Sequence, residues 1–426
     1  MPWSEEQVLA AAPDASSVKA ARRLAVPGPW SAAGSTDALL WGSCQGSGKK
    51  PYQVSIDLHG PAYRCSCPSR KFPCKHALAL LLLWSAGAIG DGEVAGFAAE
   101  WADQRATRTQ RTAAASAEPA DPEARAARRA ARLEKMDAGA DDFARWLGDL
   151  ARAGLAEALR RPVDWWEGAA ARLVDAQLPG LAERVRDTGA DVAHGLSAPE
   201  LAERVGLWWT LTRAWRSRAT LDEPLAADLA AAVGLPTPTA QVRDGERIAG
   251  TWTVAGAHRD ERGRLAQQRT WLRADDGRWV MLLETAGPGQ SLGVPQLAGA
   301  RLDAEVALYP GHAPRRGLFT GEAVPAGRAT AFVAGSTVDD ALDAAAVALR
   351  AVPWRDRHPV VLDSAALTVD GGVCDPAGTA LPLSDDTPHE RLLALTGGRA
   401  EQLFGELDGG RLRVLSVVVD GAVTSL

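Results

Sequence analysis

Apolar and polar residues alternate along the stretch PYQVSIDL near the N-terminal end of the chain. The apolar members are Tyr52, Val54, Ile56 and Leu58. A period of two is typical of a half-buried strand. The stretch AYRCSC gives a second strand-like segment, and from Lys75 to Gly87 the residues become apolar and helix-forming. The order strand, strand, helix predicts a ββα unit at about residues 40–86, within an N-terminal region 1–100.

A different pattern follows over residues 101–135. Large apolar residues are almost absent there, and alanine and arginine dominate. Such a segment cannot bury a core of its own. It predicts a basic Ala/Arg-rich linker, whose portion after Pro122 forms a solvated helix.

Residues 136–235 return to apolar positions at helical spacing and are rich in tryptophan. These tryptophans are Trp165, Trp166, Trp208, Trp209 and Trp215. We interpret them as the core of a helical region rather than as an aromatic cofactor box, because large rings at helical spacing usually fill an interior.

Beyond the segment GLPTPTAQ the period of two returns. The stretch RTWLRADDGRWVMLLE predicts a hairpin with Asp276-Gly277 at its turn. Helices are predicted over 338–351 and over PHERLLAL, where Thr387 stands as N-cap and Glu390 closes a capping box. Residues 242–426 are therefore predicted to be α+β. The whole chain is a multi-domain α+β protein, with an N-terminal ββα unit, a central helical region and a C-terminal α+β region.

Composition narrows the class of protein. The chain has 426 residues, 46% of them hydrophobic and 23% charged, with a formal net charge of −6. This balance argues against a protein that coats nucleic acid with its whole surface, although a local basic patch is compatible with it. The first residues are acidic and lack an apolar signal core. The longest apolar run, ALALLLLW, is too short to span a bilayer. We expect a cytoplasmic protein with no membrane partner.

Three of the five cysteines and one histidine fall in the stretch RCSCPSRKFPCKH. They are Cys65, Cys67, Cys74 and His76. Residues i and i+2 of a strand project to one face, so the first two thiols converge without distortion. Cys74 in the turn after Pro73 and His76 in the first turn of the following helix complete a tetrahedral set. Four protein ligands leave no open position, which is typical of a structural zinc.

Other interpretations of the cluster are weaker. A disulfide between Cys65 and Cys67 would close a strained ring in a reducing compartment. Redox pairs normally have two residues between their cysteines, and here there is one. Ligand softness favours Zn²⁺ as the ion. Cys44 is expected to be a buried small residue rather than a spare ligand, and Cys374 has no partner nearby in the sequence.

The pattern of ligands, the strand–strand–helix order and the apolar stretch after the histidine resemble the SWIM zinc finger. The stretches WGSCQGSGKKPYQVSID and YRCSCPSRKFPCKHALALLLLW resemble bacterial SWIM proteins in particular. The resemblance covers about residues 40–86, and it implies that Cys65, Cys67, Cys74 and His76 ligate one structural Zn²⁺. It also implies a module that binds DNA or proteins. No helicase or kinase motif accompanies it in this chain.

Basic residues surround the expected ligands. They are Lys49, Lys50, Arg64, Arg70, Lys71 and Lys75, and only Asp57 opposes them between residues 49 and 76. Three thiolates on Zn²⁺ add about −1, so the finger stays positive within an acidic protein. These cations are candidates for contacts with phosphates or with a protein partner. Alternatively, they offset the electron-rich thiolate site and keep the surface soluble.

No catalytic constellation is visible in the sequence. SCQGSGKK lacks the spacing of a phosphate-binding loop, and HERLL lacks the second histidine of a metalloprotease helix; His389 is expected to face solvent. We predict a non-enzymatic protein whose finger mediates protein–protein interaction, DNA interaction, or both. The alternatives are a sequence-nonspecific nucleic-acid-binding protein and, third, an enzyme in the C-terminal region.

Overall fold

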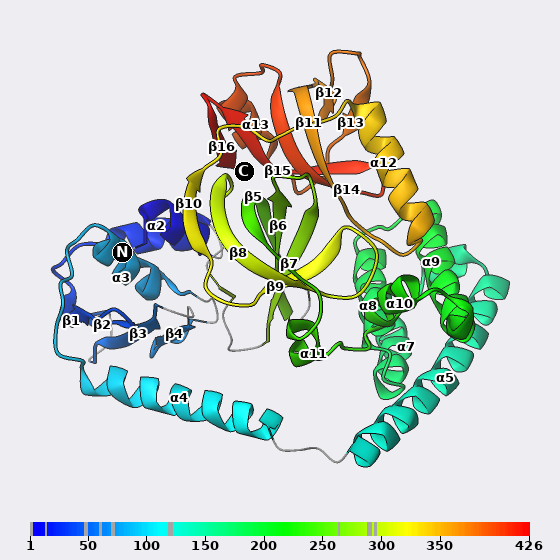
Figure 1. Ribbon diagram of the computed structural model, residues 1–426, viewed down its shortest axis with the longest axis horizontal. Helices are drawn as coiled ribbons and strands as arrows, with labels where there is room; N and C mark the ends of the chain where they lie inside the picture. The colour runs from blue at the N-terminus through cyan, green and yellow to red at the C-terminus, as the bar shows by residue number, and fades with distance from the viewer. Residues whose placement is uncertain are drawn as a thin grey trace. The chain divides into compact units, whose positions relative to one another are not determined.

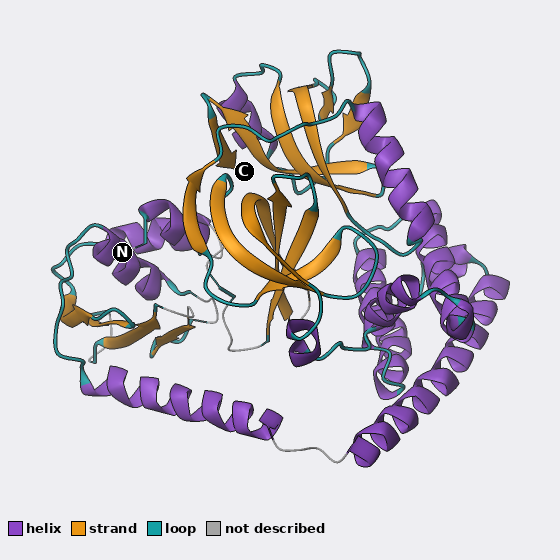
Figure 2. Cartoon of the chain, in the orientation of Figure 1, coloured by secondary structure: helices purple, strands orange, loops and turns teal. Residues whose placement is uncertain are grey.

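A computed structural model gives the fold of the chain. It describes residues 3–12, 15–46, 50–58, 62–69, 73–117, 122–262, 265–287, 292–293 and 296–426. The chain divides into two compact units. The first consists of Met1–Pro119, Ala257–Thr270 and Leu282–Ala298, and the second of Ala120–Gly256, Trp271–Met281 and Gly299–Leu426. Helices and sheets both contribute extensively (Figure 2), so the predicted mixed α+β class is confirmed.

The N-terminal part of the first unit is built on a four-stranded antiparallel sheet. Its elements are α1 (Glu5–Ala10), α2 (Ala15–Leu24), β1 (Trp30–Ser35), β2 (Leu39–Cys44), β3 (Tyr52–Asp57), β4 (Ala62–Cys65), α3 (Lys75–Ser85) and α4 (Gly96–Ala117). The strand order is β1-β2-β3-β4. The predicted ββα unit is present as β3, β4 and α3, but it is incomplete as a description because β1 and β2 extend the sheet. Those strands were missed because their sequences, WSAAGS and LLWGSC, do not alternate.

Helix α3 is the centre of this unit. Its residues from His76 to Leu83 are all buried, because α1 and α2 pack against it as well as β2 and β3. A helix that is apolar on all sides is stable only in such surroundings. Val54 and Ile56 of β3 are fully buried in the same core. Gly42 of β2 allows close approach, since an added Cβ would lie 3.0 Å from Leu80.

Helix α4 lies on the opposite side of β3 and β4 from α3 (Figure 1). Arg105 of α4 pairs with Asp57 of β3 at 2.9 Å, and Ala98 is fully buried. The first part of the predicted linker is therefore helical. Alanine, arginine and glutamine are good helix formers, so a segment with few large apolar residues still forms a helix here.

The helices of the second unit begin with α5 (Pro122–Ala153). They continue as α6 (Leu155–Ala158), α7 (Val163–Asp175), α8 (Pro179–Ala193), α9 (Ala198–Arg216), a 3-10 turn (Arg218–Thr220), α10 (Glu223–Val233) and α11 (Thr239–Arg243). The start of α5 is exposed, as expected for a solvated Ala/Arg helix. Helix α9 begins with a capping box in which Ser197 and Glu200 satisfy each other's backbone N–H groups.

The tryptophans of these helices occupy different environments. Trp166, Trp208 and Trp215 are buried in the shared core, which confirms the prediction for them. Trp165 is half-buried, and Trp209 is 45% exposed. The prediction that Trp209 fills the core is wrong, because it lies next to Trp208 on α9 and the two side chains point about 100° apart around the helix.

The next six strands form one sheet, and five of them close into a ring. They are β5 (Arg247–Arg262), β6 (Leu265–Ala274), β7 (Trp279–Ala286), β8 (Ala300–Leu308), β9 (Arg315–Phe319) and β10 (Val324–Arg328). Their order is β10-β8-β5-β6-β7-β9, and β9 also pairs with β8. This last pairing closes five strands into a small barrel. The predicted hairpin between β6 and β7 is confirmed, with Gly277 at a positive φ of 89°.

The chain ends in a six-stranded antiparallel sheet. Its elements are α12 (Val338–Ala351), β11 (His358–Leu367), β12 (Gly372–Cys374), β13 (Ala380–Pro382), α13 (His389–Thr396), β14 (Glu401–Asp408), β15 (Arg411–Val419) and β16 (Ala422–Ser425). The strand order is β13-β12-β11-β14-β15-β16. Helix α12 packs on β11, and α13 on β15.

The predicted start of α13 is wrong. The N-cap is Pro388, and Thr387 makes no capping hydrogen bond to the helix. Its buried hydroxyl instead interacts with β15, donating to the Leu412 carbonyl and accepting from the Val414 N–H at 3.4 Å each. A buried hydroxyl must find partners, and β15 supplies both.

None of the helices within the described ranges combines the length and the hydrophobicity needed to cross a bilayer.

Replacing Gly189 of α8 by alanine tests the packing of the helical region. An added Cβ would lie 2.5 Å from Cβ of the fully buried Trp166. Although alanine favours a helix, we expect G189A to lower the free energy of unfolding by about 1–3 kcal/mol through overpacking. The measurement is the urea midpoint followed by tryptophan fluorescence.

The matched control is Gly168→Ala in α7, where nothing lies within 4 Å of the added Cβ. This variant should be neutral or stabilised by up to about 1 kcal/mol. Equal midpoints for the two variants would contradict the packing described here.

Candidate metal centre

The end of β4 positions the first two cysteines. Cys65 pairs in register with Val54 of β3, so its side chain projects to the face of the sheet that α3 covers. Ser66 is fixed beside β3, since its N–H donates to the Gln53 carbonyl and its hydroxyl accepts from the Gln53 N–H, both at 3.0 Å. These bonds hold the turn that brings Cys67 back toward Cys65.

The start of α3 positions the other two ligands. Cys74 is the N-cap, in an extended conformation, and His76 lies in the first turn of the helix, as predicted. Both are nearly fully buried, at 1% and 4% exposure. The Leu78 N–H donates to the Cys74 carbonyl at 3.0 Å, which begins the helix at this point.

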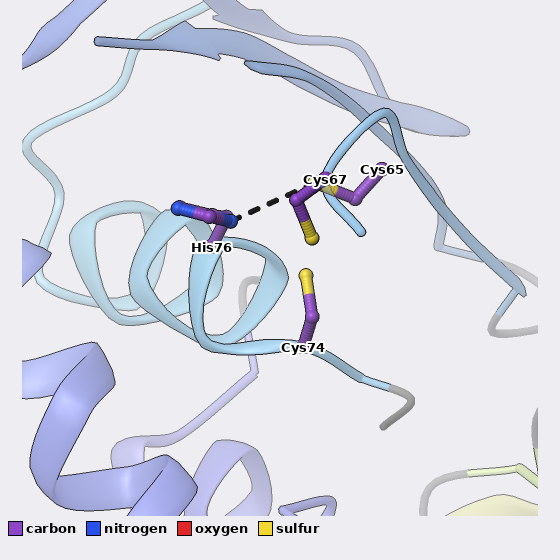
Figure 3. A group of neighbouring side chains, drawn as sticks. All are labelled: Cys65, Cys67, Cys74 and His76. Atoms are coloured by element: carbon purple, nitrogen blue, oxygen red, sulfur yellow. Dashed lines mark hydrogen bonds between the residues drawn. The ribbon is translucent and has the colours of Figure 1, made fainter. Parts of the chain in front are cut away.

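The four side chains converge on one point (Figure 3). One potential ligand atom from each of Cys65, Cys67, Cys74 and His76 lies within 4.8 Å of all the others. Nδ1 of His76 lies 3.8 Å from Sγ of Cys65. Zinc bonds of 2.0 to 2.3 Å in a tetrahedron place ligand atoms roughly 3.3 to 3.8 Å apart, so the cluster fits such an ion after a small contraction.

The protonation of the thiols also suits a metal. A hydrogen bond from Cys65, opposed by burial, lowers the pKa of Cys74 to about 4. The same hydrogen bond, together with burial, raises the pKa of Cys65. Burial raises the pKa of Cys67. Without metal the cluster therefore holds one thiolate, on Cys74, and two thiols whose protons a bound cation would displace.

Aromatic rings pack around the centre. The ring centroid of Tyr52 lies 4.9 Å from that of His76. Tyr63 is buried in the core beneath, whereas Phe72 lies outside the described residues. Cys44 is fully buried and does not belong to the cluster, as predicted, and burial raises the pKa of its thiol.

The family models identify two modules in this chain. The model of the SWIM zinc finger matches residues 52–84. The chain carries a SWIM zinc finger. The model of the SWIM-associated four-helix bundle domain matches residues 131–233. Comparison of the chain with curated proteins and with solved structures gives no match.

The SWIM zinc finger implies zinc binding, and the matched segment contains the four residues of the cluster described above. The second match accompanies the first in SWIM proteins, as its description states. It covers helices α5 to α10, for which the sequence analysis predicted helices but recognised no family.

The cations of the SWIM finger do not share one face. Lys50 precedes β3, and Lys75 is the first residue of α3; both are exposed. Arg64 is exposed on β4, and it pairs in register with Ser55, so it projects to the face opposite α3. Lys49, Arg70 and Lys71 lie outside the described residues.

Two other histidines take part in structural contacts. His389 was expected to face solvent, but it is half-buried and lies 3.3 Å from the Gly371 carbonyl through Nε2. His312 contacts Asp228 through Nδ1 at 3.0 Å. The sequence offered no signal for either contact, because the partners are distant along the chain.

Sequence reasoning missed α2, which brings Ser16 and Ser17 close to the metal ligands at the border of one cavity. The segment ASSVKAARRL does have an amphipathic pattern at helical spacing, which the sequence reasoning overlooked. Nothing in its sequence indicates that it packs on α3.

Cys74→Ser should abolish stoichiometric zinc binding and unfold residues 50–86 locally, while the other regions persist. The reason is that the buried thiolate joins the start of α3 to the end of β4. Elemental analysis, far-UV circular dichroism and limited proteolysis check this. Cys374→Ser, outside the cluster, is the control and should retain zinc. A C74S protein with wild-type spectra and proteolysis would rule out a structural role.

Zinc affinity should fall as the pH is lowered. Cys74 is already a thiolate above about pH 4, whereas the raised pKa values of Cys65 and Cys67 mean that both must lose protons. About two protons leave per ion, so the apparent Kd should increase by up to roughly a hundredfold per pH unit. Competition with a chromophoric chelator at pH 6, 7 and 8 measures this. An affinity independent of pH would contradict it.

Proposed function

We propose that this chain is a non-enzymatic adaptor whose SWIM finger, held by one Zn²⁺, docks a partner protein. The observation that carries the proposal is the closed ligand set. Three thiolates and one imidazole complete a tetrahedral site, which leaves no position for a substrate. The ion then fixes the shape of the finger, and function resides in the surface that this shape presents.

The remaining chemistry supports a non-enzymatic role. The His312–Asp228 pair is the kind of contact from which a catalytic base is built. However, Oδ2 of Asp228 also accepts the backbone N–H of His312 at 2.9 Å, and Arg355 donates to the His312 carbonyl at 3.0 Å. These bonds fix a loop against α10. No serine, threonine or cysteine within the described ranges is hydrogen-bonded to the His312 ring.

A protein partner is favoured by the arrangement of the exposed residues. Arg64 and Lys75 face opposite sides of the finger sheet, which does not suit a single phosphate backbone. In the four-helix bundle domain, Trp209 is 45% exposed, with the Arg213 guanidinium 5.9 Å from its ring. Tryptophan and arginine are the residues most enriched at the energetic centres of protein interfaces.

We also propose that the protein is located in the cytoplasm.

Nucleic-acid binding is the second candidate, and one observation favours it. The side chains of Lys50, Arg64 and Lys75 form no ion pair or hydrogen bond with any residue that the structure describes. Elsewhere arginines are commonly paired, as Arg315 is with Glu246 at 2.7 Å. Cations without protein partners are suited to phosphate contacts.

The two candidates differ in their dependence on salt. We expect the zinc-loaded chain to retain a co-purifying protein partner through nuclease treatment and 0.5 M salt, and to lose it in the C74S variant. The C374S variant should behave as wild type. Mass spectrometry of the retained fraction is the measurement.

The second measurement is fluorescence anisotropy with labelled duplex and single-stranded DNA at increasing salt. We expect little binding at 0.15 M salt. Binding that is tight at low salt, falls steeply with salt and weakens in a Lys50→Gln/Arg64→Gln variant would favour the nucleic-acid role and overturn the adaptor.

A further inference from the structure

A cavity of about 600 Å³ lies beside the metal centre, within the first unit of the chain. It is bordered by the start of α2, the segment after β2, the turn after β4 and the start of α3. His76, Lys75 and Tyr52 are among the residues that line it. Its volume is within the range of sites that bind small organic molecules.

His76 presents a donor to this cavity. The residue is only 4% exposed, and Nδ1 is the nitrogen that faces Cys65, at 3.8 Å. The other nitrogen, Nε2, points away from the cysteines (Figure 3). It makes no hydrogen bond to any residue in the described part of the chain. With Nδ1 on the metal side, Nε2 carries the proton.

The Nε2 N–H of a metal-ligating His76 needs a hydrogen-bond acceptor. Such a residue almost always donates its second ring N–H to a carboxylate, a backbone carbonyl or a water, which orients the ring and strengthens the ligand. Here the described chain supplies no acceptor, and His76 borders a cavity of molecular size. A bound molecule with a hydrogen-bond acceptor would supply the partner of the His76 Nε2 N–H.

The charges around the cavity indicate that the acceptor is an anion. The Lys75 ammonium has no ion partner among the described residues, and neither aspartate nor glutamate is among the described lining residues. The N-terminus of α3 borders the same space through Lys75. Cys67 also borders the cavity, so we place the anionic group at Lys75, whose charge is positive.

The rest of the lining suits an apolar or aromatic body. Ala20 and Leu24 of α2, Pro68 and the ring of Tyr52 contribute to it. We propose that this cavity binds a nucleotide-sized organic phosphate, whose phosphate group accepts hydrogen bonds from Lys75 and from Nε2 of His76. The planar body packs against Tyr52 and Leu24. This proposal depends on the metal centre and is independent of the docking role.

Calorimetric titration of the zinc-loaded full chain with AMP, adenosine and inorganic phosphate tests the proposal. We expect one AMP per chain, with adenosine and inorganic phosphate each bound at least about tenfold more weakly. Lys75→Gln should raise the Kd for AMP about tenfold or more, because it removes a charge-assisted hydrogen bond. Lys19→Gln is the matched control on α2, since Lys19 is exposed and is not among the lining residues.

Three further measurements guard against a misfolded variant and identify the source of the phosphate. Ala20→Phe should fill the cavity and abolish AMP binding while zinc content and circular dichroism stay normal. AMP should also slow the removal of zinc by a chelator, because it completes the surroundings of His76. A 5′-phosphorylated oligonucleotide that binds more tightly than AMP would assign the phosphate to a strand end, and weaker binding would assign it to a free nucleotide.

Absence of AMP binding to zinc-loaded wild type, or an equal loss in K19Q and K75Q, would overturn the proposal. Unchanged AMP binding by a folded A20F variant would do the same. The docking role is measured separately by co-purification, so either proposal can fail alone.

Discussion

The fold around the finger depends on the convergence of three sulfur atoms and one imidazole between the end of β4 and the first turn of α3. We do not expect β4 or α3 to be stable without the other. Strand β4 has four residues and lies at the edge of its sheet. Helix α3 is apolar on all sides, so it would not be stable as an isolated helix in water. Joining them at the ligands fixes the approach of helix and sheet, so that Val54, Ile56 and the leucines of α3 are buried together.

Sequence patterns predicted the convergence of the four candidate ligands well, because it depends on local structure. All four ligands lie within a dozen residues, and the rules for strands and helix starts are enough to bring them together. Strands with clear alternation were also predictable, as were helices with strong caps such as Thr337 of α12, whose hydroxyl accepts the Asp340 N–H. The hairpin at Gly277 follows from turn chemistry alone.

What the sequence did not reveal arises from long-range packing. Nothing in WSAAGS indicates a strand, and β1 exists because β2 lies beside it. The sequence around Thr387 predicts an N-cap, but in the fold its hydroxyl is hydrogen-bonded to β15 instead. The cavity beside His76 is formed by segments 60 residues apart in the chain, Ser16 and His76 at its extremes. Such a site has no sequence signature, since its lining comes from several separate segments of the chain.

The closure of the barrel limits the backbone hydrogen-bonding groups that the sheets of this protein leave unpaired. Because β9 pairs with β8, the ring has no open end, and only the five-residue β10 lies outside it. The C-terminal sheet ends in β13 and β16, of three and four residues, and the finger sheet ends in the short β4. Its other edge, β1, exchanges hydrogen bonds with the backbone of Gly90 and Gly92 through Ser35. The described sheets therefore have few unpaired backbone N–H and C=O groups at their edges to which a partner could add a strand. The docking role proposed above would therefore rely on side chains, which ties its specificity to surface residues that can be substituted without disturbing the fold.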